Sequence, residues 1–114
     1  MIGDRTYPIH IRDAIAKIEI YSSVGKGRFF TETHWHDAVI RQLEIIGEAT
    51  KNLSEEIRSQ HSDIPWKRIA GQRDILIHNY MGVDLNAVWA VTRKDLPNLK
   101  SRVEEILETL SESE

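Results

Sequence analysis

The fold of this chain is decided by residues 39–57, which read VIRQLEIIGEATKNLSEEI. Apolar or small side chains recur here at alternating steps of four and three residues, at Val39, Leu43, Ile46, Thr50, Leu53 and Ile57. This spacing places them on one face of an α-helix, because an α-helix turns once every 3.6 residues. Ile40 and Ile45 widen the face, so we expect a helix over about residues 33–59, capped by Thr31 or Thr33, that packs against more than one neighbour. Gly47 within it predicts close approach by another backbone.

Three further segments share this helical period. The first spans about residues 7–23, and the next begins at Pro65, a residue favoured in the first helical turn, and ends near Asn79. The last begins at Asp84 as its N-cap, and Pro97 either kinks it or marks the start of a new helix. Short connections between helices imply antiparallel neighbours. We therefore predict an all-α fold, an up-and-down antiparallel bundle of four to five helices.

Length and composition predict one globular domain over residues 1–114, with a frayed acidic tail at about 111–114. Of the residues, 40% are hydrophobic and 29% are charged. No apolar run is long enough to cross a membrane, and the N-terminus lacks the apolar segment of a secretory signal. Cysteine is absent, which excludes disulfides and thiolate sites. We therefore expect a cytoplasmic protein without membrane association.

Arg73 interrupts the apolar face of the third predicted helix. The face comprises Trp66, Ile69, Arg73, Leu76 and Tyr80, at steps of three, four, three and four. A guanidinium keeps its charge and is costly to bury unless an anion meets it. That anion is either a carboxylate of the second helix, such as that of Glu44 or Glu48, or a phosphate from outside the protein.

The third helix also concentrates positive charge in a chain whose net charge is −3. The net charge argues against nonspecific coating of nucleic acid, which depends on neutralising phosphates. Asp74 lies four residues before His78 on the same helical face, so its carboxylate can hold the imidazole in one tautomer. Arg73 and His78 are offset by about 140° around the helix and about 7.5 Å along it. Two copies of the helix across a two-fold axis would bring both residue types into one cleft.

The spacing of Arg73, His78 and Tyr80, Arg-x4-His-x-Tyr, resembles the signature of HepT-like toxins in the HEPN superfamily. Supporting matches are RQLEIIGEA at residues 41–49, IPW at 64–66, VD at 83–84 and Trp89. The resemblance covers about residues 37–99. One departure is Asp74, since relatives often have asparagine after the arginine.

The resemblance implies a metal-independent endoribonuclease that is the toxin of a type VII-like toxin–antitoxin pair and needs no cofactor. It implies a homodimer in which Arg73 and His78 cut RNA at a shared cleft, with Asp74 orienting the histidine. It also implies a minimal nucleotidyltransferase antitoxin that silences the toxin by adenylylation of Tyr80. An alternative is a catalytically inactive helical dimer that binds a nucleotidyltransferase or a nucleotide, because a structural Arg–Asp–His network has a similar sequence.

Other residues carry weaker signals. Lys67 and Arg68 precede the motif, and we expect them to contact RNA. His34 and His36 suggest a metal site, but two histidines without a third ligand make a poor one, so we interpret them as part of a solvated helix start. Trp66 and Trp89 are predicted core residues.

Overall fold

Helices form all the regular structure of the described residues. The computed structural model describes residues 3–72 and 84–113, and these ranges contain no β-strand. Their elements are α1 (Gly3–Ser22), α2 (Lys26–Thr31), α3 (Thr33–Lys51), α4 (Glu55–Gln60), α5 (Trp66–Ala70), α7 (Leu85–Ala90), the π-helical turn η2 (Val91–Asp95) and α8 (Leu96–Ser113). None of the helices in these ranges is both long and apolar enough to cross a membrane. The predicted all-α class is confirmed.

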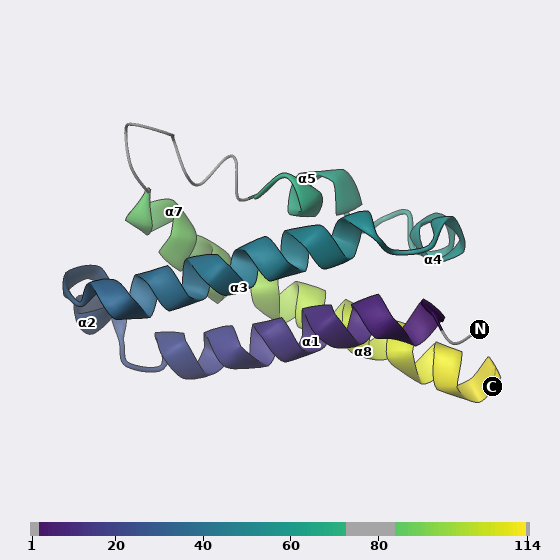
Figure 1. Cartoon of the computed structure of the whole chain (residues 1–114), viewed down its shortest axis with the longest axis horizontal. Coiled ribbons are helices and arrows are strands. Elements are labelled where there is room, and N and C mark those ends of the chain that lie inside the picture. Colours follow the sequence, from purple (N-terminus) through teal and green to yellow (C-terminus); the bar gives the residue numbers. More distant parts are fainter. Residues whose placement is uncertain (1–2, 73–83, 114) are drawn as a thin grey trace.

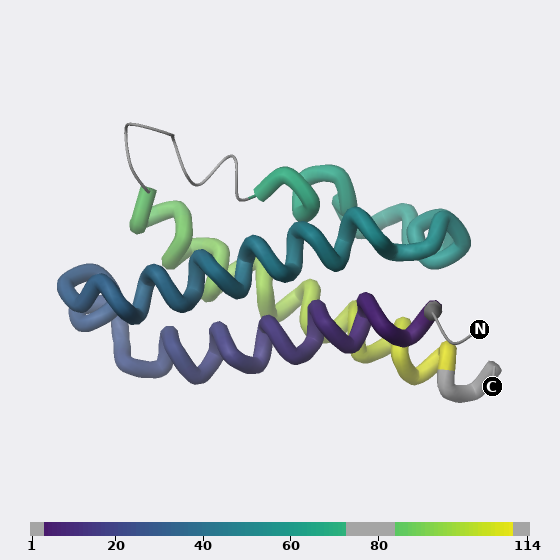
Figure 2. The backbone as a smooth tube through the Cα atoms, viewed as in Figure 1, coloured from purple at the N-terminus to yellow at the C-terminus, as the bar shows by residue number. Residues whose placement is uncertain are grey.

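Three long helices, α1, α3 and α8, form the frame of the molecule (Figure 1). α1 and α3 lie side by side and run in opposite directions, and α8 packs against α1 and returns toward the end where the chain begins (Figure 2). The short helices α2 and α5 pack against α3. This arrangement confirms the predicted up-and-down antiparallel bundle.

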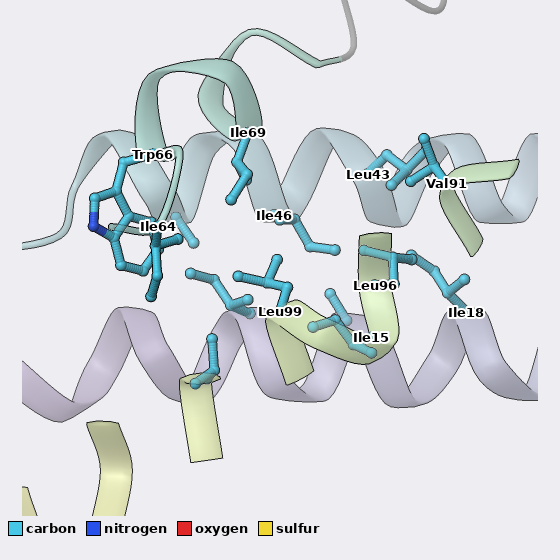
Figure 3. Packing of buried hydrophobic residues seen from close by; sticks show 14 of the residues in the cluster. Ile15, Ile18, Leu43, Ile46, Ile64, Trp66, Ile69, Val91, Leu96 and Leu99 are labelled. Carbon is cyan, nitrogen blue, oxygen red and sulfur yellow. The ribbon is translucent and has the colours of Figure 1, made fainter. Parts of the chain in front are cut away.

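One hydrophobic cluster joins these helices. The predicted face of residues 39–57 is inside it, since Val39, Leu43, Ile46, Thr50, Leu53 and Ile57 are each at most 4% exposed. α1 contributes Ile11, Ala14, Ile15 and Ile18, and α8 contributes Leu96, Leu99, Val103 and Ile106. Figure 3 shows Ile15 of α1 and Ile46 of α3 directed into the space between their helices, with Leu96 and Leu99 beside them. Burial of these apolar faces is the main force that holds the bundle together.

The single helix predicted over residues 33–59 is in fact two helices, α3 and α4. The side-chain amide of Asn52 donates to the backbone carbonyl of Glu48 (2.8 Å). The hydroxyl of Ser54 accepts from the backbone N–H of Ile57 (3.1 Å) and so caps α4. Asparagine and serine compete with the helical backbone for hydrogen bonds and favour helix ends. The prediction was wrong here because the apolar period continues across the break.

The short helix α2 was not predicted, because the sequence indicated only a break at residues 25–27. Gly25 has a φ of +94°, a backbone conformation that is strained for any residue with a side chain, and it lets the chain turn from α1 into α2. Phe29 of α2 is fully buried, and its ring centroid lies 5.0 Å from that of Trp89 in α7. α2 therefore closes one end of the hydrophobic cluster.

Pro97 occupies the second position of α8, directly after the π-helical turn η2. A proline has no N–H to donate, so the carbonyl of Arg93 four residues earlier loses its α-helical partner, and the wider turn lies at this point. α7, η2 and α8 follow one another without a break, because the backbone at Ala90, Val91 and Leu96 is α-helical. Pro97 therefore accompanies a π-helical distortion, and the start of a separate helix, the second predicted alternative, is not found. The N-cap of α7 is confirmed, because the Asp84 carboxylate accepts from the backbone N–H of Ala87 (3.1 Å).

Glu32, rather than Thr31 or Thr33, is the N-cap residue of α3, and its carboxylate links α2 to α3. It accepts hydrogen bonds from Arg28 Nε (2.7 Å) and Nη2 (2.9 Å) and from Trp35 Nε1 (3.0 Å). The hydrogen bonds from Arg28, followed by that from Trp35, lower the pKa of Glu32 to about 2. The folded-state pKa is therefore below that of an unfolded glutamate. The stabilisation is present above about pH 4.5 and is lost as the pH falls toward 2.

We expect Glu32→Gln to lower the melting temperature slightly at pH 7, because the ion pair is largely solvent-exposed. The difference from the unchanged protein should shrink as the pH falls from 5 toward 2, where the native carboxylate becomes protonated. Thermal unfolding followed by circular dichroism across this pH range measures it. A difference that stays constant with pH would contradict the proposed role of the Glu32 charge.

Candidate functional site

The predicted catalytic motif lies outside the described residues. Arg73, Asp74, His78 and Tyr80 all fall within residues 73–83, between the two described ranges. Both flanks of this segment are described: the first ends with α5 and Gln72, and the second begins at the Asp84 cap of α7. α5 thus precedes the motif in the chain and α7 follows it (Figure 1).

The N-terminal flank is held tightly against α3. Trp66 and Ile69 of α5 are 7% and 8% exposed, and the indole N–H of Trp66 donates to the carbonyl of His61 (3.1 Å). A Cβ atom added to Gly47 of α3 would lie 3.1 Å from the carbonyl oxygen of Ala70. The backbones thus approach as closely as a glycine permits, three residues before Arg73, which confirms the close approach predicted at Gly47.

The C-terminal flank is fixed at the opposite end of the bundle. Val88 of α7 is fully buried, and Trp89 packs against Phe29 of α2. The guanidinium of Arg93 lies 4.2 Å from the centroid of the Trp89 ring and donates to the carbonyl of Ser22 (3.0 Å), the last residue of α1. Both ends of the motif segment are therefore anchored to rigid helices, as a precise site requires.

The two predicted RNA contacts of α5 have different surroundings. Lys67 is exposed and lines an open hollow of about 400 Å³ between α3, α4 and α5. Arg68 instead lines a cavity of about 220 Å³ between α5 and α8, where its guanidinium lies 3.5 Å from the carboxylate of Asp95. Arg102 closes the same cavity by donating two hydrogen bonds to Asp63, which lower the pKa of the Asp63 carboxyl. Arg68 is thus partly neutralised, whereas Lys67 has no ion pair within residues 3–72 and 84–113.

The carboxylates proposed as alternative partners of Arg73 lie on α3. Glu44 and Glu48 line a cavity of about 370 Å³ together with Arg41, and Ala70 of α5 borders it. One guanidinium nitrogen of Arg41 lies 3.8 Å from the carboxylate of Glu44. Since Arg73 lies outside the described residues, its pairing with either glutamate stays a prediction.

The histidines of the sequence HWH lie at the start of α3. The Nδ1 atom of His36 is 2.9 Å from the carbonyl oxygen of Phe29, and its ring packs edge-on against the Phe29 ring. His34 is exposed and stacks on Trp35. Within the described ranges, no three histidine, cysteine, aspartate or glutamate residues are grouped as metal ligands. His36 thus has a structural role, as a link between α2 and α3.

Comparison with known proteins identifies the family. The family model described as "Ribonuclease HepT-like" matches residues 11–106. This chain belongs to the HepT-like ribonuclease family. A Thermococcus cleftensis protein named "Probable ribonuclease HepT" is 39% identical over 103 residues, which cover 90% of this chain and 94% of that protein. No solved structure matches the chain.

Two other relatives match this HepT-like chain over only part of their own length. A Methanocaldococcus jannaschii protein named "Gamma-glutamylcyclotransferase and putative RNase" is 46% identical over 110 residues, which are 96% of this chain but 50% of that protein. A "Putative RNase" of Caldanaerobacter subterraneus is 54% identical over 71 residues, which are 62% of this chain and 63% of that protein. The chain therefore spans between half and two thirds of these two relatives.

The sequence did not single out two cations that lie beside α5, Lys51 and Arg58. Both line the same open hollow as Lys67. The sequence feature that could have predicted them is Asn52 with Ser54, since asparagine and serine favour the end of one helix and the start of another. With the helix broken there, α4 brings Arg58 to the hollow.

Proposed function

We propose that this HepT-like chain is a metal-independent endoribonuclease, the toxin of a type VII-like toxin–antitoxin pair. The observation that carries the proposal is the Arg73-x4-His78-x-Tyr80 motif, which lies within the matched span of residues 11–106. The names of three relatives, which include ribonuclease or RNase, support it. So do the two flanks of the motif, which are anchored to α3 at one end and to α1 and α2 at the other.

The chemistry requires no metal ion. The RNA's own 2′-oxygen attacks the neighbouring phosphorus, the bond from phosphorus to the 5′-oxygen breaks, and the products are a 2′,3′-cyclic phosphate and a 5′-hydroxyl. His78 of one copy accepts the proton of the 2′-hydroxyl. His78 of the other copy donates a proton to the leaving 5′-oxygen. Arg73 holds the phosphate oxygens with its planar set of donors, and Asp74 orients the imidazole.

A homodimer explains how Arg73 and His78 act on one phosphate. On the helix that the sequence predicts for residues 65–79, the two residues would be offset by about 140°, so a single copy would direct them apart. A two-fold axis beside the motif would place two arginines and two histidines around a shared cleft. Such an interface should bury more than about 1,000 Å².

The alternative function is a binding module that has lost cleavage activity. Asp74 favours it, because a carboxylate next to Arg73 in the sequence could pair with the guanidinium and would add negative charge where an RNA phosphate would bind. Such a protein would bind a nucleotidyltransferase or a nucleotide through the same dimer. Activity of the isolated chain on RNA separates the two functions.

Induced expression of the chain alone tests the proposal in cells. The unchanged chain should stop growth and degrade RNA, whereas chains with Arg73→Ala or His78→Ala should accumulate without either effect. Arg12→Ala is a matched control, because Arg12 is a partly exposed arginine of α1 far along the chain from the motif. Unimpaired growth with intact RNA at high levels of the unchanged, folded chain would favour the binding module.

Tyr80 is the proposed site of control, through transfer of an adenylyl group from ATP by the nucleotidyltransferase. The phenolic oxygen attacks the α-phosphorus, pyrophosphate leaves, and the phenolic proton passes to a base of the transferase. The attached phosphate is then available to pair with Arg73 in place of RNA. We expect co-expression with the cognate nucleotidyltransferase to restore growth and to add the mass of an adenylyl group, measured on the intact protein.

The Tyr80→Phe chain is the control, since it lacks only the phenolic oxygen. It should remain toxic and unmodified when the nucleotidyltransferase is present. A Tyr80→Phe chain that the nucleotidyltransferase still neutralises completely would show that binding alone is the means of control.

A further inference from the structure

Three cations from three helices surround the open hollow beside α5. The hollow has a volume of about 400 Å³ and is lined by Thr50, Lys51, Arg58, Trp66, Lys67 and Ala70. Lys51 ends α3, Arg58 lies in the last turn of α4, and Lys67 lies in α5. All three basic side chains are exposed, and the described lining contains no carboxylate. The hollow therefore has a local excess of positive charge in a chain whose net charge is −3.

These cations differ from most exposed arginines of the described residues. Arg28, Arg41 and Arg68 each lie against a carboxylate, those of Glu32, Glu44 and Asp95. The three cations of the hollow have no ion pair with any residue of the ranges 3–72 and 84–113. Converging like charges repel one another, and a bound polyanion removes this repulsion.

The other polar groups of the hollow are already engaged. The hydroxyl of Thr50 donates to the carbonyl of Ile46 (2.7 Å), and the indole N–H of Trp66 donates to the carbonyl of His61 (3.1 Å). Among the described side chains that line the hollow, only the three cations are left to meet a ligand, and cations bind phosphates without reading the bases. The hollow therefore suits a sugar–phosphate backbone rather than a particular base.

A local role in helix stability explains each cation separately but not their arrangement. Each lies in the last turn of its helix, where a positive charge stabilises the terminal carbonyl groups. That role does not require three helix ends to meet at one hollow whose described lining has no carboxylate. The break at residues 52–54, which redirects α4, brings Arg58 to the lysines.

We propose that Lys51, Arg58 and Lys67 form a second binding site for the phosphate backbone of single-stranded RNA, beside the cleavage motif. This site rests on the proposed function, which supplies the RNA. Ala70 lines the hollow and precedes Arg73 by three residues, so their Cα atoms are at most about 11 Å apart. A strand held in the hollow thus lies close to the phosphate that is cut.

Fluorescence anisotropy with a labelled, unstructured oligouridine RNA tests the site at several salt concentrations. The His78→Ala chain is used to prevent cleavage, alone and combined with Lys51→Gln and Lys67→Gln. The slope of log K against log salt should become shallower by about 1.4, since each cation that pairs with a single-stranded RNA contributes about 0.7. Addition of Arg58→Gln should bring the total loss to about 2.1.

The matched control removes two charges elsewhere, with Lys17→Gln and Lys94→Gln. Both lysines are exposed and outside the hollow, so the salt slope should stay within about 0.3 of the starting value. A role in helix stability alone would change the melting temperatures of the variants and leave the slopes equal.

The remaining outcomes separate this site from the proposed function. One such outcome is RNA cleavage by the unchanged chain together with a salt slope that is unaffected by Lys51→Gln and Lys67→Gln. That result would contradict RNA binding at the hollow and would still support the ribonuclease activity. A salt slope that becomes shallower as expected, with no RNA cleavage by the unchanged chain, would support RNA binding at the hollow and contradict the ribonuclease activity. Loss of nucleotidyltransferase binding, with RNA binding unchanged, would overturn the RNA site in favour of an acidic protein surface.

Discussion

The purified Arg73→Ala chain should cleave RNA about a hundred to a thousand times more slowly than the unchanged chain. Removal of one group that stabilises charge in a transition state typically has an effect of this size. Arg73→Lys should also be strongly impaired, because an ammonium is a point charge and does not reproduce the two parallel hydrogen bonds of a guanidinium. Single-turnover cleavage of a labelled RNA with excess protein measures both rates.

Arg68→Ala is the matched control for Arg73→Ala. Arg68 is also an arginine of the third predicted helix, but it lies against Asp95. Its loss should reduce cleavage far less than the loss of Arg73. Equal losses from the two variants would mean that general positive charge, rather than the position of Arg73, supports cleavage.

Phe29→Ala should lower the free energy of unfolding by about 3–5 kcal/mol, the usual cost of removing a buried aromatic side chain. Phe29 is fully buried, and its ring packs against Trp89 of α7, the helix that follows the motif, and against His36 of α3. Its removal would leave a cavity among α2, α3 and α7. Urea unfolding followed by circular dichroism measures the change.

Phe30→Ala is the control for Phe29→Ala, because Phe30 is the neighbouring aromatic residue and is only half-buried. Phe30→Ala should lower the free energy of unfolding by clearly less than Phe29→Ala, because Phe30 buries less apolar surface when the chain folds. Equal losses from the two variants would show that α2 does not close the hydrophobic cluster in the way described.

The long helices could be predicted because their apolar faces are regular. Ile11 and Ile18 of α1, and Leu99 and Val103 of α8, repeat at helical spacing and are buried as that spacing predicts. The break between α3 and α4 was missed, because Leu53 and Ile57 keep the apolar period while local hydrogen bonds of Asn52 and Ser54 end one helix and start the next. The apolar spacing predicts which helix face is buried, but it does not predict whether the helix continues without a break.

The candidate site could be predicted only in part. The motif residues were predicted from their spacing and stay a prediction, since they lie outside the described residues. Gly47 correctly predicted a close approach of backbones, which α5 makes at Ala70. The hollow could not be predicted, since it depends on how α4 turns back after residue 54 and brings Arg58 to Lys51 and Lys67. The packing of the helices decides which residues of separate helices lie close together. The spacing of apolar residues along one helix does not predict this packing.

The most direct measurement of the central claim is the chemical nature of the ends that the purified chain produces on a defined RNA in excess EDTA. Attack by the 2′-oxygen, with His78 as the proton carrier and no metal ion, predicts undiminished cleavage and products that carry 2′,3′-cyclic phosphates and 5′-hydroxyls, which the His78→Ala chain does not form. Loss of activity in EDTA, or products with 3′-hydroxyls and 5′-phosphates, would contradict the account, because these results require an activated water and a metal ion rather than the 2′-hydroxyl.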